Sequence, residues 1–132
     1  MPITTGWYDD QNQVILVHYE KQYTWEELSI NLTKMREMTE SVEGNLVSIV
    51  DMSQTNSFPK GNILMQAKQI FRQVPQNFSD VIFVTESQMI RTFIGLVFDM
   101  MPSWRNKLQF AKTIEEADKL AKDAVAKNLV SI

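Results

Sequence analysis

The sequence contains no cysteine and a single histidine, His18. Without cysteine the chain forms no disulfide bond and no thiolate metal site. One histidine excludes a zinc site built from several imidazoles, and any Ser-His-Asp arrangement would depend on His18. A lone histidine on a strand is more often a packing or surface residue, so we predict no metal, no cofactor and no catalytic residue.

The chain also lacks an excess of positive charge and a long apolar run. Its formal net charge is −3, whereas nucleic-acid binding needs a basic face, so we predict no nucleic-acid partner. The longest apolar stretch, MIRTFIGLVFDMM, is interrupted by Arg91 and Asp99 and is too short for a membrane span. The first ten residues have neither the basic nor the apolar segment of a signal peptide, and we expect a cytoplasmic protein.

The sequence does contain a regular alternation of strand and helix patterns over 132 residues, a length suited to one domain, 1–132. β-Branched and apolar runs predict strands, and apolar residues at helical spacing predict helices. Alternation of this kind predicts an α/β fold whose sheet has right-handed crossovers. Strands are expected near residues 3–8, 13–20, 46–52, 80–85 and 108–111, and a helix follows each of the last four.

Two of the helices begin with capping boxes, in which a hydroxyl and a carboxylate bind backbone amides that the first turn leaves free. Thr24 with Glu27 predicts the start of the first helix, and Thr113 with Glu116 predicts the start of the last. The run LVSIVDM after the first helix is almost entirely apolar, which is typical of a central strand covered on both faces. The short run LQFA predicts an edge strand.

A polar loop follows the central strand and carries Asp51, Ser53, Ser57, Lys60 and Gly61. Ligands of open α/β sheets bind outside the carboxyl ends of the strands, so this loop is a candidate anion site or switch. In a functional role, Asp51 would be a base or a cation ligand. In a structural role, it would brace the loop by accepting hydrogen bonds from amides of residues 53–57 or by pairing with Lys60. We favour the brace, because no second carboxylate or histidine is recognisably partnered with Asp51.

The third helix, from Ser87 to about Met101, has more apolar residues than one helix on one sheet needs. Such a surplus of methionine and aromatic residues indicates a partner surface or an apolar ligand pocket. The alternative is a helix that lies deep between other elements of the same domain. The candidate residues for the surface are Met89, Phe93, Leu96, Val97, Met100, Met101 and Trp104.

Three passages give the chain a resemblance to a known family. LVSIVDMSQTNSFP, DVIFVTESQMIRTFIGLVFDM and LQFAKTIEEADKLAKDAV resemble strand-and-helix units of the SpoIIAA-like proteins, a class joined to the STAS (anti-sigma-factor antagonist) and SEC14-type lipid-binding domains. The resemblance covers nearly the whole chain. It implies a βα superhelix with a mixed sheet of about four to five strands and about four helices, and a non-enzymatic module.

The resemblance also bears on the polar loop. In the anti-sigma-factor antagonists a partner kinase phosphorylates a serine at the start of the second helix, and the added charge switches binding. In this chain the matching place lies near residues 59–61, which offer no hydroxyl, and Ser57 lies a few residues earlier. The relation to SEC14-type domains implies apolar ligands.

We therefore expect a non-enzymatic bacterial interaction module that binds a protein partner or itself, as a homodimer formed through the third helix. The alternative is a small-molecule or lipid carrier or sensor with a pocket between the third helix and the strand ends. An enzyme is the third hypothesis. It requires His18 or Glu86 within hydrogen-bond reach of Asp51 in a closed pocket.

Overall fold

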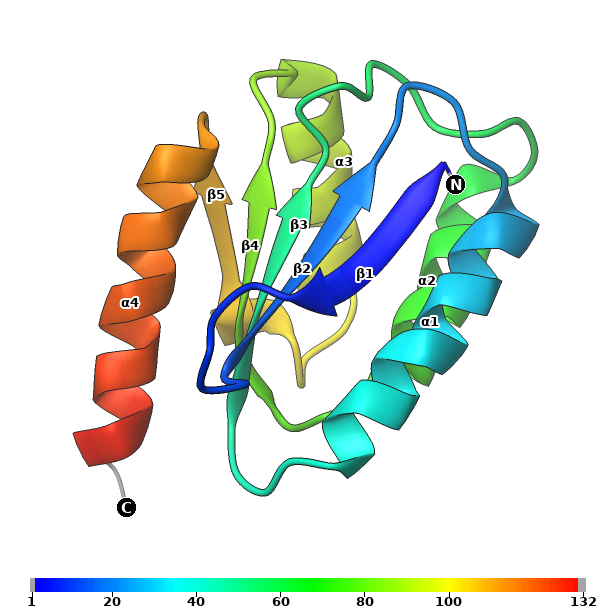
Figure 1. Cartoon of the computed structure of the whole chain (residues 1–132). Helices are drawn as coiled ribbons and strands as arrows, with labels where there is room; N and C mark the ends of the chain where they lie inside the picture. Colours follow the sequence, from blue (N-terminus) through cyan, green and yellow to red (C-terminus); the bar gives the residue numbers. More distant parts are fainter. Residues whose placement is uncertain (1, 131–132) are drawn as a thin grey trace.

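The computed structural model describes residues 2–130 and contains a five-stranded mixed sheet with the order β1-β2-β3-β4-β5 (Figure 1). β1 is antiparallel to β2, and the other neighbouring pairs are parallel. The predicted α/β fold with a mixed sheet and four α-helices is confirmed. The strands are β1 (Ile3–Trp7), β2 (Val14–Tyr19), β3 (Leu46–Asp51), β4 (Phe78–Val84) and β5 (Leu108–Ala111). The helices are α1 (Trp25–Glu40), α2 (Ile63–Gln73), α3 (Gln88–Asp99) and α4 (Ile114–Val130), with a 3₁₀ helix, η1, at Arg105–Lys107.

Helices cover the two faces of the sheet unequally (Figure 1). α1, α2 and α3 connect strands that advance one position at a time in the same direction across the sheet. Because such crossovers are right-handed, all three helices lie on one face. α4 follows the last strand and packs on the opposite face, against β3, β4 and β5. Two apolar clusters result, a large one under α1, α2 and α3 and a smaller one under α4.

β3 is the central strand, as its apolar run predicts. Its first five residues are buried, because β2 and β4 flank it and helices cover both of its faces. Leu46 and Val50 belong to the cluster under α1–α3, whereas Val47 and Ile49 belong to the cluster under α4. This alternation is the two-residue period of a strand. β5 lies at the edge of the sheet, also as predicted.

The helix starts follow the predicted caps. Thr24 Oγ1 accepts a hydrogen bond from the Glu27 amide at 3.1 Å, and the Glu27 carboxylate accepts one from the Thr24 amide at 2.8 Å, which completes the capping box. At α4, Thr113 Oγ1 accepts the Glu116 amide at 3.1 Å, but the Glu116 carboxylate accepts the amide of Lys112. The carboxylate thus reaches back one residue further than a capping box requires.

α3 carries the longest apolar stretch of the sequence. It runs for 12 residues and ends at Asp99, slightly before the predicted end near Met101. None of the helices within residues 2–130 combines the length and the apolar content that crossing a membrane requires.

We expect Thr24→Ala to lower the free energy of unfolding by about 1 kcal/mol, because the Glu27 amide loses its acceptor at the start of α1. Urea unfolding followed by circular dichroism measures the loss. Thr33→Ala is the matched control, since Thr33 is exposed in the interior of the same helix and alanine is the better helix former. Equal losses in the two variants would contradict the capping role.

Candidate functional site

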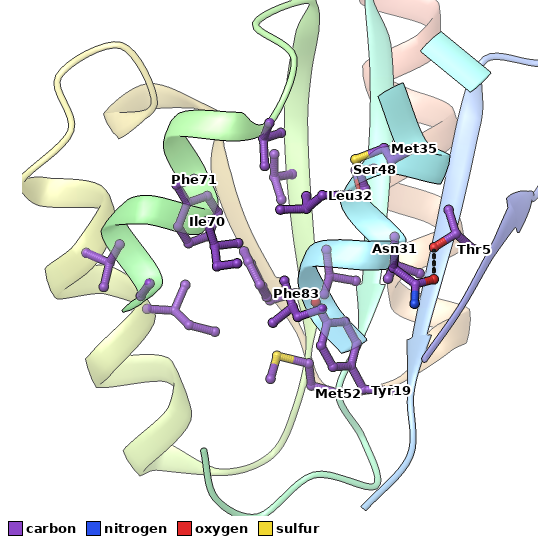
Figure 2. Close-up of a pocket in the computed structure, with 18 of the residues that line it drawn as sticks. Thr5, Tyr19, Asn31, Leu32, Met35, Ser48, Met52, Ile70, Phe71 and Phe83 are labelled. Carbon is purple, nitrogen blue, oxygen red and sulfur yellow. Dashed lines mark hydrogen bonds between the residues drawn. The ribbon is translucent and has the colours of Figure 1, made fainter. Parts of the chain in front are cut away.

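A cavity of about 100 Å³ lies between the sheet and the helices α1, α2 and α3. Figure 2 shows Leu32 and Met35 of α1 and Ile70 and Phe71 of α2 pointing into this space. Aliphatic, aromatic and methionine side chains form most of the wall, and no charged side chain of the described residues belongs to it. This composition is typical of a pocket for an apolar molecule.

The cavity follows from a mismatch between the spacing of helices and the spacing of strands. Neighbouring strands lie about 4.8 Å apart, whereas the axes of packed helices lie about 8–10 Å apart. Three helices that connect successive strands on one face therefore cannot all lie directly on the sheet. α2, the middle helix, packs mainly against α1 and α3 rather than against any strand. The space between α2 and the strands β3 and β4 stays partly empty.

Two polar atoms of residues that line the cavity lack a hydrogen-bond partner within residues 2–130. They are Ser48 Oγ on β3 and Trp104 Nε1 just before η1, and both residues are buried. By contrast, Thr5 Oγ1 in the same wall donates a hydrogen bond to Asn31 Oδ1 at 2.9 Å (Figure 2). An unpaired buried polar group destabilises a fold, so Ser48 and Trp104 require a physical explanation.

Tyr19 and Tyr23 line the cavity near the carboxyl ends of the parallel strands. Their rings meet edge to face, with centroids 4.9 Å apart. Burial raises the pKa of both phenols well above the ordinary tyrosine value, so both hydroxyls are neutral at physiological pH. A charged ligand group would find no counter-ion in this wall.

A polar surface groove of about 520 Å³ adjoins the cavity. Tyr23 and Phe58 line both spaces, so these two side chains stand between the groove and the cavity. The Phe58 ring packs on Phe93 of α3, with centroids 4.8 Å apart. Ser57 and Lys60, two of the predicted loop residues, lie in the groove, and both are exposed.

The other residues of the predicted loop have structural roles. Asp51 Oδ1 accepts the Ser53 amide at 3.0 Å, which confirms the predicted brace. Asp51 does not pair with Lys60, whose carbonyl instead accepts a hydrogen bond from Trp25 Nε1 at 3.1 Å. Gly61 has a φ of +122°, a backbone conformation that residues with a side chain rarely adopt, and it turns the chain into α2.

Asp51 has a partner that the sequence analysis did not identify. His18 Nδ1 lies 3.0 Å from Asp51 Oδ2, because the parallel register places His18 of β2 beside Asp51 of β3. Burial raises the pKa of Asp51, but hydrogen bonds from Ser53 and His18 outweigh burial and leave this pKa below its ordinary value. The prediction that no histidine partners Asp51 is therefore wrong.

The His18–Asp51 pair meets only one of the two conditions set for acid–base chemistry. The two side chains are within hydrogen-bond reach, but neither lines the cavity or the groove. Val14 and Leu16 precede His18 on the same side of β2 and pack in the cluster under α4, so the pair lies on the face opposite the cavity. Within residues 2–130 no group of three His, Asp or Glu side chains could hold a metal ion.

The candidate residues of the third helix divide between two surfaces. Phe93, Val97 and Trp104 line the cavity, and Val97 and Trp104 are fully buried. Met101 is half-buried and packs against the larger apolar cluster. The outward group is exposed over 53%, 54% and 45% of its surface and consists of Met89, Leu96 and Met100. Phe93, Val97 and Trp104 therefore belong to the candidate ligand site. The outward group belongs to the candidate partner surface.

Comparison of the chain with protein-family models, with curated proteins and with solved structures finds no match in any of the three. The resemblance to the SpoIIAA-like and STAS proteins therefore stays a prediction. Support for a function comes from the cavity, the groove beside it and the outward face of α3.

Ser48 is one of the cavity residues that the sequence analysis did not single out. A signal for it exists, because Ser48 is the one polar residue in LVSIV, a run predicted to be buried on both faces. A polar residue at such a position is informative, since burial without a partner is costly.

We expect Asp51→Asn to lower the free energy of unfolding at neutral pH by about 1 kcal/mol, because the hydrogen bonds from Ser53 and His18 to a charged acceptor are lost. The pKa of Asp51 is lower in the folded chain, so this stabilisation is present at neutral pH and is lost as the pH falls through the folded-state pKa. Urea unfolding at neutral pH and near about pH 3 measures the change.

The difference between the unmodified chain and Asp51→Asn should shrink at the lower pH. Asp10→Asn serves as the control, since Asp10 is exposed in the loop after β1, and we expect little effect at either pH. A difference of the same size at both pH values would contradict the linkage to Asp51.

Proposed function

We propose that this chain is a non-catalytic binding module whose internal cavity receives a small apolar molecule. The observation that carries this proposal is a space of about 100 Å³ lined mostly by apolar side chains from the sheet and from α1, α2 and α3. Protein interiors are normally close-packed, and a void costs stability because its walls lose contacts. A bound molecule would restore those contacts, which supports the role of a carrier or sensor.

The volume of the cavity sets the size of the ligand. An apolar cavity of about 150 Å³ accommodates benzene or xenon, whereas pockets for drug-sized ligands have about 300–1,000 Å³. The space of about 100 Å³ therefore suits a compact molecule near the size of benzene after a small outward shift of the wall. Phe58 and Phe93 are half-buried wall residues, so they can shift with little loss of packing. A long lipid chain would require α2 to move away from the sheet.

We expect benzene to bind the unmodified chain and to shift the amide resonances of residues around the cavity in a ¹⁵N NMR titration. Ala67 lies on α2, faces the cavity and is 8% exposed. Ala67→Leu places a larger side chain in the cavity and should weaken benzene binding by about tenfold or more, because the volume left for the ligand becomes too small.

Ala126→Leu is the matched control, since the same substitution on the exposed side of α4 leaves the cavity unchanged. We expect this variant to bind benzene as the unmodified chain does. If benzene shifts no cavity resonance in the folded protein, or binds Ala67→Leu equally well, the proposed function is refuted.

The outward face of α3 favours a second function, self-association. Met89, Leu96 and Met100 are large, apolar and exposed, and their spacing of i, i+7 and i+11 places them on one side of the helix. Grouped exposed apolar side chains mark interaction sites on soluble proteins. We propose a homodimer that buries this face.

We expect light scattering at high micromolar concentration to give the mass of a dimer for the unmodified chain. Leu96→Glu and Met100→Glu should each give the mass of a monomer, because a carboxylate buried at the interface would lack a partner. Ile30→Glu is the control, since Ile30 is 58% exposed on α1, away from the proposed interface, and its substitution should leave the mass unchanged. A monomer mass for the unmodified chain would exclude this homodimer.

A further inference from the structure

Most of the cavity wall is apolar, and two of its residues, Ser48 and Trp104, carry buried polar atoms that lack a partner in the described chain. We infer that the ligand is a compact, neutral molecule that carries a hydrogen-bond acceptor, such as a carbonyl or ether oxygen, for Ser48 and Trp104. This inference rests on the proposed function, because it specifies the chemical class of molecule that the same cavity binds. It follows from three features of the site: the position of Ser48, the position of Trp104 and the absence of charge in the wall.

Ser48 occupies a place in the sheet where every neighbour is apolar. Its partners in the parallel register are Ile15 on β2 and Val81 on β4, and Val81 is paired in turn with Leu108 on β5. Ser48 is 3% exposed, and its hydroxyl has no hydrogen-bond partner in the described part of the chain. An apolar side chain in this row would cost less stability than an unpaired hydroxyl does. The hydroxyl is therefore explained by a group in the cavity that accepts its hydrogen bond.

Trp104 is a second residue of the cavity wall that has an unpaired donor. The residue is 0% exposed, and Nε1 has no acceptor among residues 2–130. Its ring makes an edge-to-face contact with Phe98, and the Lys107 ammonium lies 4.7 Å from its centroid. The indole N–H is only a donor, so the group that satisfies it must be an acceptor. The ring cannot turn this N–H to solvent without breaking those contacts.

Ser48 lies on β3, whereas Trp104 lies in the segment that leads through η1 into β5. Ser48, Val81 and Leu108 lie in one row across three strands, so Ser48 and the start of β5 are about 10 Å apart. Trp104 lies four residues before Leu108 and reaches the cavity with its long side chain. The polar end of a compact molecule is therefore expected to turn toward Ser48 or toward Trp104, while its remaining surface lies against the apolar wall.

The wall also limits the charge of the ligand. None of the described residues that line the cavity is acidic or basic. Thr5 already donates to Asn31 Oδ1, and Asn31 Nδ2 donates to the Glu27 carbonyl. An ionised ligand would lose its hydration without gaining a counter-ion, which is strongly unfavourable. A neutral acceptor needs only neutral donors, such as the serine hydroxyl and the tryptophan N–H.

The test compares two probes of nearly the same shape, cyclopentanone and methylenecyclopentane, in NMR titrations of the full chain. Cyclopentanone carries the acceptor, whereas methylenecyclopentane replaces its oxygen with a CH₂ group. In a cavity without donors the hydrocarbon binds more tightly, because the ketone loses its hydration. We expect the unmodified chain to bind the ketone at least as tightly as the hydrocarbon, because Ser48 and Trp104 replace the lost water.

Two variants remove one donor each. Ser48→Ala and Trp104→Phe should each lower the ratio of ketone affinity to hydrocarbon affinity roughly three- to tenfold. The ratio is the decisive quantity, because a change in cavity size affects both probes alike. Thr5→Val is the matched control, since its hydroxyl lies in the same wall but already has a partner, and we expect it to leave the ratio unchanged.

The outcomes separate this inference from the proposed function. If both probes bind and the ratio is the same in the unmodified chain, Ser48→Ala and Trp104→Phe, the acceptor is refuted while the cavity function stands. If neither probe binds the folded chain, both are refuted. Ser48→Ala should also unfold at no lower urea concentration than the unmodified chain without ligand, because the hydroxyl has no protein partner to lose. A clear loss of stability would show that the hydroxyl is already satisfied and would overturn the inference.

Discussion

The different spacings of helices and strands are the constraint on which the rest of this structure depends. Each crossover advances by one strand, about 4.8 Å, but each helix needs about twice that width. With α1, α2 and α3 on one face, the middle helix packs on its two neighbours and stands away from the sheet. Large side chains such as Phe71 and Met35 bridge most of the gap, and the remainder is the cavity.

The opposite face solves the same packing problem with small side chains. Of the helices in the described part of the chain, α4 alone lies on that face, and it places Ala117, Ala121 and Ala124 against the sheet. Alanine allows α4 to approach the sheet closely, so this cluster is compact. With no second helix of residues 2–130 beside it, α4 can lie directly on the sheet. α4 packs on β3, β4 and β5 and leaves the end of β2 open, which is why His18 and Asp51 stay partly accessible there.

The unpaired polar atoms of the cavity residues cost stability, and a binding function explains why they are there. Ser48 and Trp104 each bury a hydrogen-bonding group without a partner in the described chain, and an apolar residue in either place would serve the core better. Natural sequences depart from local consistency mainly where a site requires it. The cavity combines such a departure with an uncharged apolar wall, whereas the His18–Asp51 pair is fully explained as a hydrogen bond between adjacent strands.

Much of the fold could be predicted because it depends on neighbours in the sequence. The capping box of Thr24 and Glu27 marks the start of α1, and the apolar run at 46–52 marks the central strand. The brace between Asp51 and Ser53 was predicted for the same reason, since its partners are only two positions apart in the sequence. The site was harder to predict. The sequence indicated candidate site residues on the third helix, but it did not show that Phe93 lines a cavity whereas Leu96 lies on the outer surface.

By itself, the sequence determined the class of fold, the starts of the helices and the apolar character of α3, because these depend on periodicity and on contacts within one turn. Only the tertiary structure decided the rest. The register of β2 against β3 brought His18 to Asp51 across 33 residues. The position of α2 above the sheet opened the cavity and left Ser48 without a partner. Both results depend on how separate elements are spaced in three dimensions, and no local pattern of residues contains that spacing.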